Sequence, residues 1–139
     1  MRIFWYGHAA FRLTSEGGVR IIIDPYQSGA FDGALMYGKV SDEADIVLKS
    51  HDHDDHNYTE DIKGSFTGID HEGDYTIRDF HIRAIPTFHD QAEGAERGRN
   101  LVFRIEGDGL VVVHAGDLGH IPDPDFIREL GKVDVLLLP

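Results

Sequence analysis

The sequence contains no cysteine, which excludes disulfide bonds and thiolate metal ligands. Any metal site must therefore use nitrogen and oxygen donors. Basic residues are also scarce, since 13 lysines and arginines stand against 25 aspartates and glutamates and give a formal net charge of −12. An acidic surface repels phosphate backbones, so we expect no nucleic-acid partner.

Long hydrophobic runs are absent too. No apolar stretch approaches the roughly 20 residues that a membrane-spanning helix needs. The chain opens directly on the strand-like run MRIFWYG and shows neither the basic nor the apolar region of a signal peptide. We therefore expect a cytoplasmic protein without a membrane partner, and the lack of cysteine agrees with that compartment.

Short β-prone segments dominate what is present. A chain of 139 residues that is 41% hydrophobic suits one domain with its own core, here residues 1–139. Apolar patterning and turn residues predict two helices, at 57–63 and 122–130. They also predict strands at 2–6, 11–15, 19–24, 44–50, 65–69, 74–79, 81–88, 101–106, 110–114 and 133–138. The expected fold class is α/β.

The most informative segment is SHDHDDH, residues 50–56, directly after an apolar strand. In an extended chain alternate side chains share a face, so His51, His53 and Asp55 would point the same way, and a turn would let His56 join them. Imidazole and carboxylate groups suit zinc, and manganese or iron are compatible. An EF-hand is excluded because the glycine and the final glutamate of that loop are missing.

With its surroundings, this motif resembles the metallo-β-lactamase superfamily, whose defining pattern is H-x-H-x-D-H. Further matches, arranged as in the branch related to L-ascorbate-6-phosphate lactonase, are Trp5-Tyr6-Gly7-His8-Ala9, Asp24-Pro25, His89-Asp90 and Gly116-Asp117. Segments 97–100 and 115–120 resemble a subgroup of uncharacterised hydrolases within that branch. The resemblance covers essentially the whole chain. It implies an αββα sandwich with two face-to-face sheets and helices outside.

The resemblance also implies two divalent metal ions and a hydrolytic activity. The implied ligands are His51, His53 and His89 for the first ion, Asp55 and His56 for the second, and Asp117 as the bridge between them. A hydroxide shared by the two ions would attack a lactone, an ester or amide, or a phosphodiester. A small phosphorylated metabolite is the leading candidate substrate. Asp55 and Asp117 are the candidate catalytic residues, because Asp55 could orient the hydroxide or accept a proton.

Four further residues are candidates for supporting roles. His8 could hydrogen-bond a metal ligand or Asp24, and Asp24 could itself support the site. The alternatives are a core histidine and a strand-ending aspartate. Arg97 and Arg99 could bind phosphate or carboxylate from the loop after His89, or form a solvated basic face. The remaining histidines are not expected to be direct ligands: His71, His81, His114 and His120.

The chain ends at Pro139, directly after an apolar strand, and the family's last second-site histidine would lie beyond that residue. We therefore expect a fold truncated at the C-terminus. One alternative function is a metal-binding, catalytically incomplete fragment that needs another chain segment. Exposed apolar sheet would then favour a homo-oligomer or a complementary C-terminal segment as partner. A nuclease of the same superfamily is a further alternative, which the acidic charge disfavours.

Overall fold

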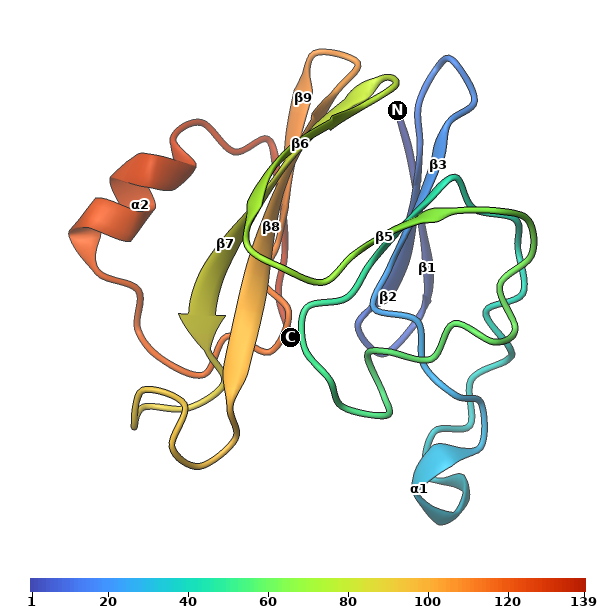
Figure 1. The fold of residues 1–139 in the computed structure, drawn as a ribbon, viewed down its shortest axis with the longest axis horizontal. Helices are drawn as coiled ribbons and strands as arrows, with labels where there is room; N and C mark the ends of the chain where they lie inside the picture. The colour runs from blue at the N-terminus through green and yellow to red at the C-terminus, as the bar shows by residue number, and fades with distance from the viewer. The chain divides into compact units, whose positions relative to one another are not determined.

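The computed structural model describes residues 1–139, which form two compact units, residues 1–70 and 71–139. Each unit contains one five-stranded sheet, and most of the elements are labelled in Figure 1. Two mixed sheets with few helices match the expected α/β class. The expectation that the whole chain is a single domain stays a prediction.

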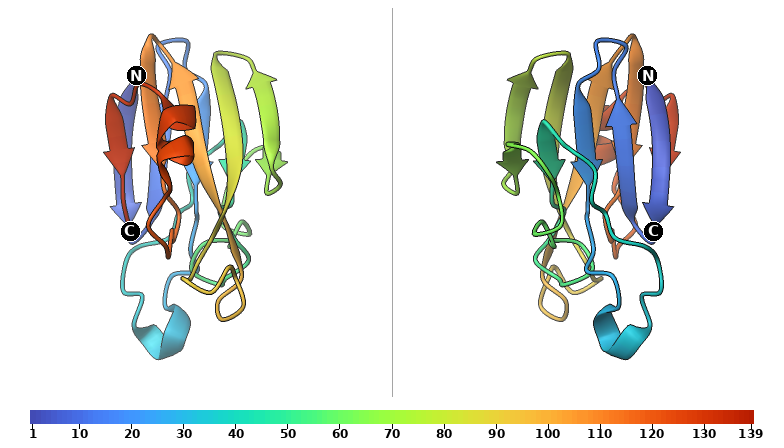
Figure 2. Two further views of the ribbon diagram at one scale, coloured as in Figure 1. Left: turned by 90° about the vertical axis from the view of Figure 1, so that its left-hand side faces the viewer. Right: turned by 90° about the vertical axis from the view of Figure 1, so that its right-hand side faces the viewer.

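The first unit contains a sheet with the strand order β1-β2-β3-β4-β5. Its strands are β1 (Arg2–Gly7), β2 (Ala10–Thr14), β3 (Arg20–Ile23), β4 (Ile46–Leu48) and β5 (Thr67–Ile69). The first three strands pair antiparallel, and β3–β4 and β4–β5 pair parallel (Figure 2, right). Since β3 and β4 run in the same direction, their C-terminal ends lie at one edge of the sheet, and the residues that follow them become neighbours.

Burial of β3 anchors this unit. Ile21, Ile22 and Ile23 are fully buried, as their uninterrupted apolar run predicts. Ile22 packs in a cluster with residues of the glycine-rich segment between β3 and β4: Tyr26, Leu35, Val40 and Ala44. That segment also contains the short helix α1 (Ala30–Gly33). The segment therefore covers one face of the sheet largely without regular structure.

The second unit contains a sheet with the strand order β10-β9-β8-β7-β6. Its strands are β6 (Gly73–Ile77), β7 (Phe80–Phe88), β8 (Arg99–Gly107), β9 (Leu110–His114) and β10 (Val135–Leu137). Both β7 and β9 pair antiparallel with β8, so these two strands run in the same direction. Their C-terminal ends consequently lie at one edge, which is where His89 and the 115–119 turn begin.

Helix α2 (Pro124–Leu130) covers one face of the second sheet (Figure 2, left). The Asp123 side chain caps it by accepting a 2.8 Å hydrogen bond from the Phe126 N–H, and proline occupies the first turn. Leu130 and Phe126 pack on a cluster formed by Ile85, Val102, Val111 and Val113. The helix predicted at 122–130 is thus confirmed, and so are all ten strands, with shifts of a few residues at their ends.

Two local expectations are wrong. Residues 57–63 do not form a helix, because two of their backbone N–H groups bond to other segments: Tyr58 N–H donates to Pro25 O and Lys63 N–H to Asp42 O. The histidine motif is not extended either. Strand β4 ends at Leu48, and residues 51–56 form bends and a turn closed by a hydrogen bond from His56 N–H to His53 O.

Candidate metal centre

In the first unit, the parallel pairing of β3 with β4 places Asp24 beside Ser50. The Asp24 carboxylate is fully buried and accepts hydrogen bonds of 2.7 Å from both the backbone N–H and the hydroxyl of Ser50. Its Oδ2 also lies 3.0 Å from Nδ1 of His56, which is fully buried as well. A buried carboxylate needs such donors, so the Nδ1 proton of His56 is directed at Asp24. Nε2 is then the nitrogen of His56 suited to a metal.

His51 is oriented from the same point. Its Nδ1 lies 2.9 Å from the Ser50 hydroxyl, so its Nε2 is also the nitrogen suited to a metal. The His51 ring lies 4.5 Å from the His53 ring and 4.2 Å from the His56 ring, measured between centroids. The motif residues of this unit therefore gather their imidazoles although the segment is not extended.

A second group in this unit combines His8, Asp55 and His56. Asp55 Oδ2 lies 3.0 Å from His8 Nε2 and 3.7 Å from His56 Nε2. One donor atom from each of the three residues lies within 4.8 Å of the others. Two imidazole nitrogens and a carboxylate oxygen suit a borderline divalent metal. The donor chemistry of this unit therefore fits a metal ion, and the partner of His8 is Asp55 rather than Asp24.

In the second unit, His89 follows β7 and Asp117 follows β9, and their side chains meet. His89 Nε2 lies 3.2 Å from Asp117 Oδ2. Fully buried Asn100 on β8 holds the Asp117 backbone, because its Oδ1 accepts a 3.0 Å bond from the Asp117 N–H. Its amide nitrogen donates to Ala115 O and Thr87 Oγ1, both at 2.9 Å. Asn100 thus ties the ends of β7, β8 and β9 together, a role its sequence context did not reveal.

Gly119 allows the 115–119 turn to approach the end of β7. Its N–H donates a 2.9 Å bond to Phe88 O. A Cβ at position 119 would lie only 2.1 to 2.4 Å from the His89 carbonyl and the Asp90 nitrogen. Both are backbone groups and cannot swing aside, so this contact requires glycine.

Asp90 organises the loop of residues 90–97. Its buried carboxylate accepts hydrogen bonds from four backbone N–H groups, those of Ala92, Gly94, Glu96 and Arg97, over 2.7 to 3.1 Å. These bonds, the one from Arg97 foremost, lower the pKa of the Asp90 carboxyl to about 2. The loop therefore folds around one charge and is fixed at the base of the Arg97 side chain.

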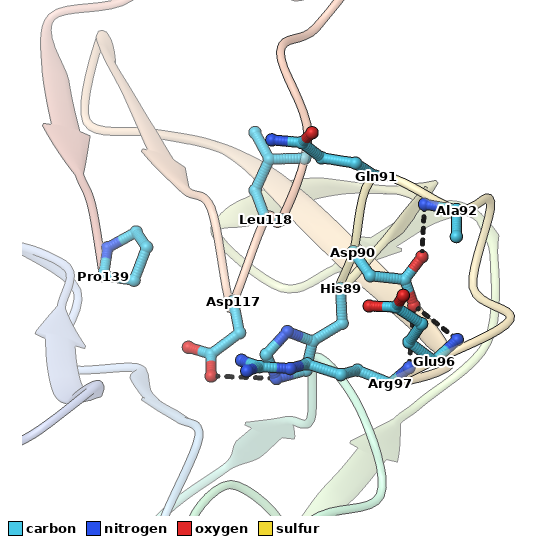
Figure 3. A pocket seen from close by; sticks show the side chains of 10 residues that line it. His89, Asp90, Gln91, Ala92, Glu96, Arg97, Asp117, Leu118 and Pro139 are labelled. Atoms are coloured by element: carbon cyan, nitrogen blue, oxygen red, sulfur yellow. Dashed lines mark hydrogen bonds and ion pairs between the residues drawn. The ribbon is translucent and has the colours of Figure 1, made fainter.

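A pocket of about 570 Å³ lies between this loop and the 115–119 turn (Figure 3). His89 and Asp117 line it together with Arg97, whose side chain extends from the loop in their direction. Arg99 is exposed at the start of β8 and does not line this pocket. Of the two candidate arginines, only Arg97 is placed beside candidate ligands of the second unit.

The remaining histidines have other surroundings. Buried His114 accepts the Gly116 N–H on its Nδ1 at 3.1 Å, which stabilises the turn before Asp117. His120 Nδ1 lies 3.2 Å from the Ile121 carbonyl. His81 lies on the surface near Glu106 and Asp74.

No helix in the structure combines the length and the apolar character required to cross a bilayer.

Comparison with known proteins identifies the family. A family model described as a beta-lactamase superfamily domain matches residues 2–139. A UPF0173 metal-dependent hydrolase of Thermococcus kodakarensis is 30% identical over 164 residues, which cover 100% of this chain and 71% of that protein. A similarly named protein of Methanopyrus kandleri is 29% identical, again with 100% and 71% covered.

Comparison with solved structures supports the same family. The crystal structure of a candidate Zn-dependent hydrolase of the metallo-β-lactamase superfamily from Thermotoga maritima is similar, with a TM-score of 0.75 and 37% identity. The similarity covers 96% of this chain but 58% of that one, so the chain spans just over half of its length. The superfamily expected from the sequence and its fold are confirmed. The lactonase-like branch stays a prediction.

We predict that Gly119→Ala separates His89 from Asp117, because the added methyl group would meet backbone atoms. The distance between the side chains of His89 and Asp117 should be longer in a crystal structure of the variant. The free energy of unfolding, measured in urea, should fall by about 1 to 3 kcal/mol. Gly109→Ala is a matched control, since a Cβ at that position of the β8–β9 turn meets nothing within 4 Å but faces a positive φ of 74°. Unchanged positions of His89 and Asp117 in Gly119→Ala would contradict the prediction.

We predict that Asp90 stabilises the fold in a pH-dependent way. Its folded pKa of about 2 lies below the ordinary value of 3.8, so its contribution is present above pH 4 and is lost as the pH falls toward 2. In metal-free protein, urea unfolding should show a larger loss of stability for Asp90→Asn at pH 7 than at pH 3. Glu93→Gln, in the same loop, should show little loss at either pH. An equal loss for Asp90→Asn at both values would refute this.

Proposed function

The chain belongs to the β-lactamase superfamily, and we propose that it acts as a metal-dependent hydrolase of a small molecule. The meeting of His89 and Asp117 in the wall of an open pocket is the observation that carries this proposal. Relatives named metal-dependent hydrolases, and the donor group of His8, Asp55 and His56 in the first unit, support it. Zinc is the first choice of metal, with manganese or iron as alternatives.

The proposed ligands are those implied by the resemblance. His51, His53 and His89 would hold one ion, Asp55 and His56 the other, and Asp117 would bridge them. Supporting this assignment, Nδ1 of His51 and of His56 is engaged with Ser50 and Asp24 respectively, which leaves Nε2 in the tautomer that binds metal. Asp24 is therefore proposed to orient a ligand rather than to bind metal itself.

Hydrolysis bonds the hydroxyl group of water to the carbonyl carbon or phosphorus of the substrate and breaks the bond from that atom to the leaving group. The second proton of water goes to the leaving atom, which is oxygen in an ester or phosphodiester and nitrogen in an amide. When bound, the metal ions lower the pKa of water and polarise the substrate oxygen. The chain supplies orientation: Asn100 and Gly119 hold Asp117 against His89, and Asp24 holds His56. Asp55, partly exposed, is proposed to orient the attacking water or to accept its proton.

The pocket supports a small, anionic substrate. Its volume of about 570 Å³ is in the ordinary range for a small-molecule site. Arg97 presents a planar cation that suits phosphate or carboxylate, and the Asp90 bonds fix the base of its side chain. We propose a lactone, ester, amide or phosphodiester of a phosphorylated metabolite. The net charge of −12 still disfavours a nuclease.

Metal analysis and hydrolysis assays test the proposal together. We expect two divalent ions per chain and turnover within a panel of lactones, esters and phosphodiesters. Asp117→Ala should bind less metal, and its kcat/KM should fall by at least about 100-fold, because the proposed bridge is removed. Asp125→Ala, at an exposed position of helix α2, should retain both the metal and the activity. One ion per chain without turnover would instead favour the catalytically incomplete fragment, completed by another copy or a complementary segment.

Arg97→Gln should raise KM for a phosphorylated substrate by about 10- to 100-fold, the range expected for one lost charge-assisted hydrogen bond. It should leave kcat/KM for a neutral ester of the same acyl group nearly unchanged. Arg99→Gln is the matched control, because Arg99 lies outside the pocket. If Arg97→Gln changed the kinetic constants of both substrates equally, Arg97 would not bind the anionic group.

A further inference from the structure

The turn between β1 and β2 places His8 in an unusual way. His8 is not glycine, yet it adopts the left-handed conformation, with φ 49°. The preceding Gly7, at φ 119°, passes so close to the Tyr37 ring that a Cβ there would lie 2.3 Å from it. The indole N–H of Trp5 closes the turn with a 2.8 Å bond to the His8 carbonyl. This backbone holds the His8 imidazole at Asp55.

The distance from His8 to Asp55 matches that expected for two ligands of one ion, and the distance from His56 to Asp55 exceeds the tetrahedral value by about 0.3 Å. Donors that each lie about 2.1 Å from a metal stand roughly 3.0 Å apart at a right angle and roughly 3.4 Å apart at a tetrahedral angle. His8 Nε2 lies 3.0 Å and His56 Nε2 3.7 Å from the same oxygen of Asp55. The two rings are inclined by 69° with centroids 5.0 Å apart, so both edges can face a common point.

We propose that His8 is itself a metal ligand. His8 Nε2, Asp55 Oδ2 and His56 Nε2 form a three-donor site for a divalent cation within the first unit. The proposal rests on the metal dependence of the proposed function but adds a ligand to the set that the family resemblance implies. Two imidazoles and one carboxylate leave coordination positions open for water or substrate, an arrangement compatible with zinc, manganese or ferrous iron.

An ion pair alone accounts poorly for this geometry. The side chains of His8 and Asp55 are 33% and 20% exposed, and a partly exposed pair of this kind adds little to stability. Strained backbone conformations of non-glycine residues persist where surrounding structure enforces them and gather at ligand sites. The contact with Asp24 also orients His56, because it turns His56 Nε2 toward Oδ2 of Asp55, the atom that His8 also faces.

NMR of the full chain loaded with ¹¹³Cd²⁺, a spin-½ stand-in for zinc, tests the proposal directly. Through-bond coupling between ¹¹³Cd and imidazole ring protons arises only when the ring nitrogen is bonded to the metal. We expect the ring protons of His8 and His56 to correlate with one and the same ¹¹³Cd resonance. Correlation of His56 without His8, correlation with two different resonances, or no correlation for either residue would overturn the proposal.

Two substitutions separate a ligand from a hydrogen-bond partner. Gln can donate a hydrogen bond to Asp55 but does not replace an imidazole ligand. We expect His8→Gln and His8→Ala both to weaken Cd²⁺ binding by more than about 100-fold, beyond the loss typical of an outer hydrogen-bond partner. Exposed His71→Ala should bind as the wild type does. Wild-type affinity in His8→Gln would reduce His8 to a positioning residue and overturn the ligand assignment.

The outcomes also distinguish this proposal from the proposed function. A wild-type chain that binds two metal ions and hydrolyses substrate, but shows no coupling at His8, would retain the function and lose only the His8 site. A chain that binds no divalent ion would lose both. Circular dichroism of each variant confirms that reduced Cd²⁺ affinity does not reflect unfolding.

Discussion

The candidate centre of the first unit depends on a carboxylate removed from water. Burial of the Asp24 charge is costly unless donors surround it, and here Ser50 supplies two and His56 a third. The same contacts fix the ends of β3 and β4 at one edge and set the tautomer of His56. The folding requirement and the chemical requirement are therefore met by one residue, which explains why Asp24 is fully buried although it would not bind metal.

In the second unit, neutral groups hold the strand ends together. Asn100 uses both ends of its amide to join three strand ends, and Gly119 removes the side chain that would otherwise separate them. An amide costs less to bury than a charge, and all its partners here are local to one sheet edge. The carboxylate of Asp90 is instead satisfied by four backbone N–H groups of its own loop, one of which belongs to Arg97.

The strands and the gathering of motif residues could be predicted, because alternation and the H-x-H-x-D-H spacing are local in sequence. Burial of Ile21–Ile23 could be predicted as well, because an uninterrupted apolar run is also local in sequence. The helix expected at 57–63 does not form, because the N–H groups of Tyr58 and Lys63 bond to residues far away in the sequence. The structural roles of Asn100 and Gly119, which lie in segments 97–100 and 115–120, could not be predicted for the same reason. Each contacts strand ends or backbone distant in the chain, and no local pattern shows such contacts.

Electrostatics connects these parts. A net charge of −12 repels an anionic substrate at long range, and two divalent ions would offset only four of those charges. Recognition of the proposed anionic substrate would then depend on charges close to it. At physiological ionic strength the screening length is about 8 Å, so charges within the pocket outweigh the distant acidic surface. Arg97 is one such charge, and a backbone already fixed by Asp90 would reduce the conformational entropy that the loop loses when a substrate binds. Under the proposed function, the four bonds to Asp90 would order the loop before the substrate arrives.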